Sequence, residues 1–271
     1  MPDLVPMKAH VYKDPRPPEY FEPFHRRART REPDLVYAVV RIVTSVFCWI
    51  VFRARSISAD NVPNVGPVIV APNHFSYDDH FFVACFLRRR VRFMAKSQLF
   101  TGPMAWVYSH GGVFPVRRGH RDAEALTTAR TILANGDTIT MYPEGGRSRT
   151  GALAEQARPG VGRLALESGA TVVPVAIHGS SRVRNWRRGE FPRITVHYGR
   201  PMRWEPVETP TRAQQQAVSD EVFAEIRALY QELETNGRRR VAHAERARRK
   251  SQPREITTPL RPAPPAGEDD E

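Results

Sequence analysis

Cysteine, lysine and long hydrophobic segments are all scarce in this 271-residue chain. Its two cysteines, Cys48 and Cys85, are too few for a disulfide scaffold or an all-cysteine zinc site. Both lie in apolar runs, so we expect buried thiols. The first thirty residues lack the apolar core of a signal peptide, and we therefore expect none. With 41% hydrophobic residues, the chain is nevertheless apolar enough to build a core and is not expected to be disordered throughout.

The chain has an excess of positive charge, with 41 Lys+Arg against 29 Asp+Glu and a formal net charge of +12. Residues 61–200 carry +10 of this charge. Only 4 of the basic residues are lysine and 37 are arginine, which suits bidentate binding of phosphate, although a GC-rich genome would produce the same ratio. The charge predicts an anionic partner, which is a nucleic acid, a membrane surface or a phosphorylated substrate.

The N-terminal part divides into two segments. Residues 1–34 are proline-rich without periodicity and predict an irregular leader. Residues 35–52 form the longest apolar run, with Arg41 as its only charge and arginines on both sides. Its 18 residues fall just short of the ~20 that span a bilayer. We favour a membrane-associating helix over 35–54 that lies in the interface, and keep a spanning helix and a soluble core helix as alternatives.

Strand and helix patterns alternate between residues 55 and 237, which predicts one α/β domain. The expected strands are residues 67–71, 91–95, 112–116, 138–142, 172–177 and 194–198. The expected helices are residues 78–89, 98–109, 121–135, 159–168 and 213–235. Thr211 is the expected N-cap of the last helix, and Asn236-Gly237 its stop. Residues 238–271, first basic and then Pro-rich and acidic, predict a disordered tail that either is solvated or helps to bind anionic lipid.

A histidine and an aspartate follow the first of these strands, in the stretch Ala71-Pro-Asn-His-Phe-Ser-Tyr-Asp-Asp79. His74 should lie in the loop at the carboxyl end of the strand, where α/β sheets place ligand sites. Asp79, in the first turn of the next helix, can then fold back to orient the imidazole, whose other nitrogen takes a proton from a hydroxyl. The plainer alternative is a loop histidine followed by a helix-capping aspartate.

Three further stretches follow or form predicted strands. Gly112-Val-Phe-Pro-Val-Arg117 ends in an arginine that can bind phosphate. Tyr142-Pro-Glu-Gly-Gly-Arg-Ser148 contains two glycines that allow backbone N–H groups to approach an anion, although an ordinary β-turn would have the same residues. Val173-Pro-Val175 lies in a strand that we expect to line the site, and we do not expect His178 to be a second base.

Taken in order, these four stretches resemble the lysophospholipid (1-acyl-sn-glycerol-3-phosphate) acyltransferase family over roughly residues 55–205. The resemblance rests on the His74-x4-Asp79 pattern and on the three stretches that follow it in the family's order. Tyr142 stands for the usual Phe, Gly146 for the common Thr, and Pro115-Val116 for the frequent Ile-Asp. These departures concern the acceptor specificity more than the reaction type.

The resemblance implies a mixed, mostly parallel sheet covered by helices, and an O-acyltransferase. The acyl group would move from acyl-CoA or acyl-carrier protein to the hydroxyl of a lysophospholipid, most simply 1-acylglycerol-3-phosphate, giving phosphatidic acid. His74 is then the general base and Asp79 its orienting partner. The substrate-binding residues it implies are Arg117, Glu144, Gly145, Gly146 and Arg147. It implies no metal and no organic cofactor.

Other functions remain open at this point. The acceptor can instead be glycerol-3-phosphate, lyso-ornithine lipid or another lysolipid. A non-catalytic basic protein that binds membrane or nucleic acid is a different class of alternative. Nucleic acid is the weaker partner, since no nucleic-acid-binding motif is present and aromatic residues do not alternate with the basic ones. We expect a peripheral or monotopic enzyme on the cytoplasmic face of the cell membrane, bound to its anionic surface.

Overall fold

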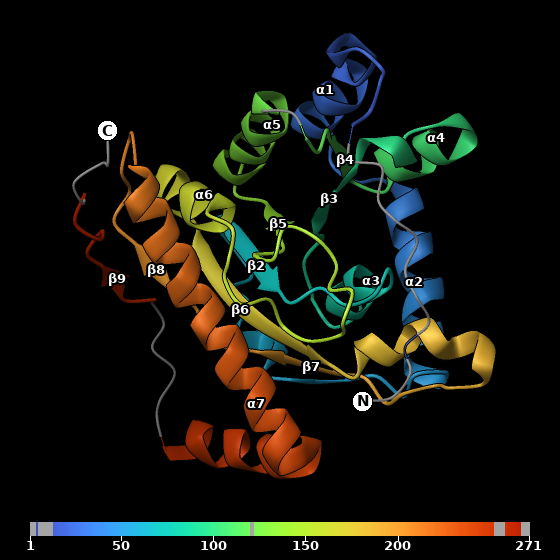
Figure 1. Ribbon diagram of the computed structural model, residues 1–271, viewed down its shortest axis with the longest axis vertical. Helices are drawn as coiled ribbons and strands as arrows, with labels where there is room; N and C mark the ends of the chain where they lie inside the picture. Colours follow the sequence, from blue (N-terminus) through green and yellow to red (C-terminus); the bar gives the residue numbers. More distant parts are fainter. Residues whose placement is uncertain (1–3, 5–12, 120–121, 252–257, 267–271) are drawn as a thin grey trace.

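The computed structural model describes residue 4 and residues 13–119, 122–251 and 258–266. Seven strands form one sheet in the order β1-β7-β6-β2-β5-β3-β4, and β8 pairs with β9 apart from it (Figure 1). β6, β2, β5, β3 and β4 are parallel to one another, whereas β7 and β1 run the opposite way. The predicted mixed, mostly parallel sheet is confirmed. The strands are β1 Arg55–Ile57, β2 Val68–Pro72, β3 Arg92–Lys96, β4 Val113–Val116, β5 Thr138–Thr140, β6 Thr171–His178, β7 Thr195–Tyr198, β8 Arg203–Trp204 and β9 Leu260–Arg261.

Helices cover both faces of the sheet. The α-helices are α1 Glu22–Thr30, α2 Leu35–Ile50, α3 Asp79–Ala84, α4 Gly102–His110, α5 Ala123–Ala134, α6 Gly160–Ser168 and α7 Arg212–Ser251. Short 3₁₀ helices are η1 Pro18–Tyr20, η2 Ala59–Asn61, η3 Ser97–Leu99 and η4 Ser180–Arg188. α5, α6 and α7 lie over one face, and α2 and α3 over the other (Figure 1).

The period-two alternation of the strands builds two apolar cores, one on each face. In β2, Ile69 and Ala71 pack with α5, α6 and α7, while Val68 and Val70 pack with α2 and α3. All five residues of β2 are buried, as expected for a strand covered on both sides. The carboxyl ends of β2 and its neighbour β5 therefore meet at one edge of the sheet, which brings the loops that follow them together.

All six predicted strands are present, and two helix predictions need correction. The helix expected over 98–109 begins only at Gly102, after the separate 3₁₀ helix Ser97–Leu99. The predicted helix over 78–89 ends at Ala84, because the chain turns away to reach β3. Arg89 fixes this turn by donating hydrogen bonds to the carbonyls of Pro63, Gly66 and Gly136. β1 was not predicted, since its three residues Arg-Ser-Ile carry too little pattern.

The predicted irregular leader is wrong for residues 22–30, which form α1. The prediction took the prolines of this segment as a sign of irregular structure. Pro18 and Pro23, however, occupy first turns of helices, where a missing N–H is harmless. Phe21, just before α1, is 1% exposed and packs with Phe100 and Ala105. Residues 1–3 and 5–12 lie outside the described part of the chain.

The apolar run over 35–52 forms α2, which begins after Asp34, whose side chain accepts the N–H of Val36. Its single charge points inward, since the Arg41 guanidinium donates to the carbonyls of Leu87 and Arg89. Its outer face is apolar and exposed, comprising Leu35, Val39, Ile42, Val43, Val46, Phe47, Trp49 and Ile50.

This exposure does not fit the soluble core helix that we kept as an alternative. In the described residues, no single helix has the length and apolar character to cross a membrane; α1 and α2 meet that criterion only as a pair, which is bent by 89°.

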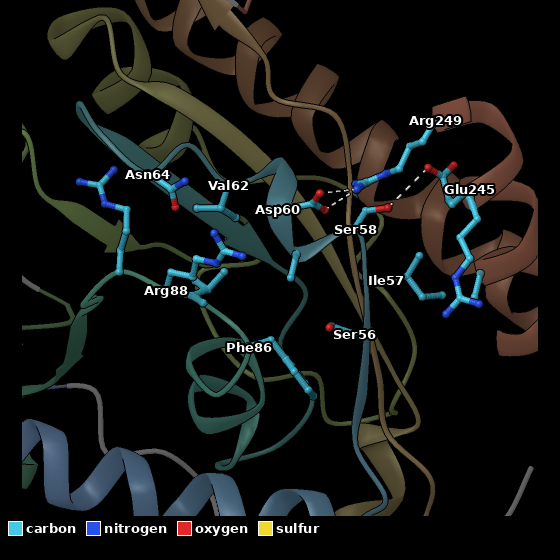
Figure 2. Close-up of a pocket in the computed structure, with 15 residues that line it drawn as sticks. Ser56, Ile57, Ser58, Asp60, Val62, Asn64, Phe86, Arg88, Glu245 and Arg249 are labelled. Carbon is cyan, nitrogen blue, oxygen red and sulfur yellow. Dashed lines mark hydrogen bonds and ion pairs between the residues drawn. The ribbon is translucent and has the colours of Figure 1, made fainter. Parts of the chain in front are cut away.

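The predicted disordered tail is wrong for residues 238–251, which continue α7 as a second helical segment beyond Gly237 (φ 69°, ψ 157°). We call this segment the distal half of α7. It docks on the β1–η2 region, where Arg249 forms an ion pair with Asp60 and Ser58 donates to Glu245 (Figure 2). Residues 258–266 are also placed, with β9 beside β8, whereas 252–257 and 267–271 lie outside the described residues.

Candidate active site

His74 and Asp79 are joined by a hydrogen bond of 2.9 Å between the imidazole Nδ1 and the carboxylate Oδ2. His74 lies in the loop after β2, and Asp79 is the first residue of α3. The same Oδ2 accepts the N–H groups of Phe75 and Ser76 at 2.7 and 2.8 Å, so the loop wraps around the buried carboxylate. The predicted contact between the two side chains is confirmed, and Nδ1 is the nitrogen that faces the carboxylate.

The loop that carries His74 is fixed from its base by Asn73, which sequence reasoning left without a role. The Asn73 side chain accepts the N–H of Ile177 at 2.7 Å and donates to the Ile177 carbonyl at 3.2 Å. It thereby extends the pairing between β2 and β6 by one residue beyond the end of β2. The sequence did indicate a structural role for Asn73, because a polar residue directly after a buried strand needs a hydrogen-bond partner.

The loop after β5 holds the backbone of His74 from both sides. The Glu144 Oε1 accepts the His74 N–H at 2.8 Å, and the Ser148 N–H donates to the His74 carbonyl at 2.8 Å. The Tyr142 ring stacks on the imidazole, with centroids 3.9 Å apart and planes inclined by 20°. Glu144 was expected to bind the substrate, and in this structure its carboxylate holds the backbone N–H of His74.

Burial shifts the pKa of both His74 and Glu144. Burial lowers the pKa of His74 below its usual 6.5, Asp79 opposes this, and the cations Arg147 and Arg118 add to it. Burial also raises the pKa of Glu144 to about 7, against the effect of the His74 N–H. A histidine with a lowered pKa is neutral at physiological pH, which is the form that accepts a proton.

Two arginines lie near the imidazole, and one of them was not predicted. The Arg147 guanidinium lies over the Tyr77 ring, 3.2 Å from its centroid. Arg118 Nη1 lies 3.6 Å from where a Cβ on Gly146 would be. The predicted Arg117 turns away, because its Nη2 donates to the carbonyl of Arg16 at 2.9 Å.

The strand that precedes Arg117 and Arg118 explains why one of them lies near His74 and the other turns away. Successive side chains in an extended chain point to opposite sides, so only one member of the Arg117-Arg118 pair can face His74. Residue identity alone did not indicate which one.

Gly145 and Gly146 form the turn that follows β5. Gly145 has φ +67°, a conformation that favours glycine, and its N–H closes the turn onto the Tyr142 carbonyl at 3.0 Å. Its N–H is therefore occupied, so of the two glycines expected to let N–H groups approach an anion, Gly145 does not offer its own N–H. Within the described residues, the N–H of Gly146 has no such backbone partner.

No group of three or more His, Cys, Asp or Glu residues within the described ranges is arranged to hold a metal ion. A cavity of about 470 Å³ lies elsewhere, between the β1–η2 region, the turn after α3 and the distal half of α7 (Figure 2). None of the predicted site residues lines it. The predicted pair His74 and Asp79 and the loop of residues 142–148 therefore lie apart from this cavity.

Comparisons with known proteins match the part of the chain that contains these loops. The model of the Acyltransferase family matches residues 53–178. A 1-acyl-sn-glycerol-3-phosphate acyltransferase of Streptococcus pneumoniae is 22% identical over 215 residues, covering 77% of this chain and 79% of that protein. A chloroplastic 1-acyl-sn-glycerol-3-phosphate acyltransferase of Arabidopsis thaliana is 23% identical over 167 residues, 60% of this chain but only 44% of that protein. A second chloroplastic relative, from Brassica napus, is likewise matched over 43% of its length.

The fold has a counterpart among solved structures. The 1-acyl-sn-glycerophosphate acyltransferase PlsC of Thermotoga maritima superposes with a TM-score of 0.58 at 22% identity, covering 80% of this chain and 89% of that one. The matched region begins just before β1, ends with β6 and contains all four motifs. Over residues 53–178 the chain is thus similar to the Acyltransferase family, as the order of the motifs predicted.

Proposed function

We propose that this protein transfers a fatty acyl group from acyl-CoA or acyl-carrier protein to the hydroxyl of a lysophospholipid. The observation that carries the proposal is the hydrogen bond between His74 Nδ1 and the buried Asp79 carboxylate. It leaves Nε2 as the nitrogen that can accept a proton, and this nitrogen has no hydrogen-bond partner among the described residues. His74 is at the same time 12% exposed at its side chain, so a substrate can reach the ring.

In the reaction, Nε2 takes the proton of the acceptor hydroxyl as the oxygen attacks the thioester carbonyl carbon. Asp79 stabilises the imidazolium that forms, and general-base assistance of this kind contributes about 10²–10⁴-fold. The tetrahedral intermediate collapses as the C–S bond breaks. The leaving thiolate takes the proton from His74, which restores the neutral imidazole. The carbonyl oxygen carries negative charge in between, and the N–H of Gly146 is the backbone donor that we assign to it.

The acceptor that we propose is 1-acylglycerol-3-phosphate, with phosphatidic acid as the product. The relatives named above are acyltransferases of this acceptor, and Arg147 and Arg118 place two cations near the imidazole. Guanidinium groups bind phosphate oxygens through paired hydrogen bonds. Arg117 can join them only if its guanidinium leaves the Arg16 carbonyl, and its predicted role in phosphate binding stays a prediction.

We also propose that the enzyme lies on the cytoplasmic face of the cell membrane, bound through α2. The outer face of this helix is apolar and exposed over its whole length, from Leu35 to Ile50. Monomeric soluble proteins rarely expose contiguous apolar surface of this kind. Membrane contact through α2 brings a water-soluble thioester and a lipid acceptor to the same surface.

An acceptor panel tests the proposal. Purified protein is given labelled acyl-CoA or acyl-carrier protein together with 1-acylglycerol-3-phosphate, glycerol-3-phosphate, lyso-ornithine lipid or a phosphate-free lysolipid. We expect the highest kcat/KM with 1-acylglycerol-3-phosphate. A preference for another acceptor would correct the substrate and leave the reaction intact, whereas no acyl transfer to any acceptor would reject the enzyme.

A further inference from the structure

Five arginines gather beside the end of α2, although they come from three distant parts of the sequence. We call this group the arginine cluster; its members are Arg53, Arg55, Arg193, Arg238 and Arg239. The fold brings them together through β1, because the Arg55 N–H donates to the carbonyl of Ile194, next to Arg193. Arg238, just after the break in α7, donates to the carbonyl of Arg53 at 3.2 Å.

The positive charge of this cluster is not balanced by the described part of the protein. None of the five arginines forms an ion pair with a carboxylate among the described residues, and four are exposed. Burial lowers the pKa of Arg238, and the other four arginines lower it further. Five guanidinium groups held together without counter-charge favour the binding of an anion.

An exposed aromatic residue, Phe191, contacts the arginine cluster, and the buried Phe52 connects it to α2. Phe191 is 44% exposed, and its carbonyl accepts the Arg53 guanidinium at 2.6 Å. Phe52 joins it to the helix, since its ring lies 6.3 Å from that of Phe191 and 5.6 Å from that of Phe47. Trp186, on η4, is 53% exposed. In the view of Figure 1 this gold segment overlaps the lower end of α2.

η4 is also attached to the loops of the active site. The Arg184 guanidinium donates to the carbonyls of Phe75, Ser148 and Arg149 at 3.2, 3.0 and 3.0 Å. The inner face of the segment is thereby held against the loops that position His74, while Trp186 faces outward with the Arg187 guanidinium over its ring at 5.3 Å. A ligand of this outer surface is thus held at a fixed place relative to the catalytic histidine.

We infer that the arginine cluster, together with Phe191 and Trp186, is a second membrane contact that binds the phosphate groups of anionic lipids. It extends the apolar surface of α2, and the inference therefore rests on the proposed function, which places α2 at the membrane. Aromatic rings beside arginines suit the interface, because the rings enter the headgroup region while the guanidinium groups bind its phosphates. An acidic protein surface would match the charge but not the exposed apolar surface beside it.

Vesicle binding tests this inference with the purified full chain. The variant is Arg55→Gln/Arg193→Gln/Arg239→Gln, which spares the hydrogen bonds of Arg53 and Arg238. Each arginine near an anionic surface strengthens binding about fivefold, so the triple variant should lose roughly 100-fold in affinity for vesicles of phosphatidylcholine with phosphatidylglycerol. Its affinity for vesicles of phosphatidylcholine alone should not change. Added salt should weaken the binding of the wild type to anionic vesicles more than that of the variant.

The matched control is Arg130→Gln/Arg203→Gln/Arg212→Gln, which removes three exposed arginines on α5, β8 and the start of α7. It should bind both vesicles nearly as well as the wild type. Equal losses in the two triple variants would overturn the inference, because net charge alone would then explain the binding. So would an unchanged affinity of the first variant for anionic vesicles.

Two further results separate this inference from the proposed function. In the first, the wild type binds neutral and anionic vesicles equally and still transfers acyl groups. That result would reject the second membrane contact and leave the proposed acyltransferase activity intact. If the first variant loses turnover with acyl-carrier protein but not vesicle binding, the surface docks the acidic donor and the inference is again wrong. Turnover of the first variant with acyl-CoA in neutral detergent micelles should equal that of the wild type, which also shows that it folds.

Discussion

Asp79 gives His74 a fixed orientation and a partner for its positive charge. Its Oδ2 accepts three N–H groups, one from the imidazole and two from the loop backbone, so the carboxylate is held before any substrate arrives. Glu144 and Ser148 fix the backbone of the same histidine. The proposed general base is thus oriented by neighbours on two loops, which favours a proton transfer without rearrangement.

Asp79→Asn should lower kcat/KM roughly 10²–10⁴-fold, because the amide no longer stabilises the imidazolium. Asp79 raises the pKa of His74, so the variant's acid limb should also move to lower pH. Asp78→Asn is the matched control, since Asp78 is the adjacent carboxylate and bonds to the Ser76 hydroxyl rather than to His74. Steady-state kinetics across pH measure both; an Asn variant of Asp79 with wild-type kcat/KM would remove the dyad from the mechanism.

Arg118→Gln should shift the acid limb of kcat/KM to higher pH. The positive charge of Arg118 disfavours the imidazolium and lowers the pKa of His74, so its removal raises that pKa. Arg117→Gln removes the neighbouring arginine, whose guanidinium bonds to the Arg16 carbonyl, and should leave the limb in place. Equal shifts in the two variants would show that Arg118 is no closer to the imidazole than Arg117.

The spacing of His74 and Asp79 was sufficient to predict their contact, since a strand followed by a helix leaves few ways to connect them. The sequence did not predict which of Arg117 and Arg118 faces His74. The answer depends on how far the alternation of side chains in β4 continues beyond the end of the strand. The role of Glu144 depended on a contact between two loops 70 residues apart, which no local pattern records.

At the scale of elements, α6 and α7 position the loop after β5 by packing unusually closely. Gly162 permits this, because a Cβ there would lie 2.0 Å from the Gln215 carbonyl oxygen on α7. The Gly162 N–H also donates to the Ser219 hydroxyl at 2.8 Å. The end of the loop that carries Glu144 and Arg147 is therefore anchored where the two helices cross.

Gly162→Ala should destabilise the protein by about 3 kcal/mol, since the added methyl group meets backbone that cannot move aside. Helix propensity alone would predict a gain of about 1 kcal/mol. Gly160→Ala is the control in the same helix, because its Cβ would meet the flexible end of Met141 instead. Chemical denaturation measures both; a Gly162 variant as stable as the wild type would contradict the close approach of α6 and α7.

The sequence predicted elements whose pattern is local and missed those that depend on distant partners. The six predicted strands are apolar runs, which need no further information. α1 is polar and proline-containing, and it is stabilised by Phe21 packing against α4, a contact that the local sequence does not reveal. The distal half of α7 reads as a basic tail, yet Val241 is 1% exposed in a cluster with Ile57, Ala176 and Leu233.

For the whole molecule, the basic residues behind the formal charge of +12 lie at several sites rather than at one. Arg118 and Arg147 lie near the imidazole, the arginine cluster lies beside the end of α2, and Arg249 is used in an internal ion pair. Many other arginines donate to backbone carbonyls, as Arg41 and Arg184 do. The net charge alone therefore does not identify the partner, whereas its distribution around α2 and the active-site loops supports a membrane substrate.

Ile42→Glu/Ile50→Glu should reduce binding to both neutral and anionic vesicles, because two charges would enter the apolar interface. These side chains are 64% and 71% exposed, so the fold should tolerate the change. Val65→Glu/Leu260→Glu alters two exposed apolar residues outside α2 and serves as the control. Sedimentation with vesicles measures the bound fraction, and a double variant of α2 that sediments like the wild type would reject α2 as the membrane contact.

Acyl transfer by the wild type and by His74→Ala, compared in one assay with labelled acyl-CoA and 1-acylglycerol-3-phosphate, tests the central claim most directly. We expect the wild type to form phosphatidic acid and the variant to lose about 10²–10⁴-fold in rate while keeping the unfolding midpoint of the wild type. Phosphatidic acid formed by His74→Ala at the wild-type rate would contradict the proposed mechanism.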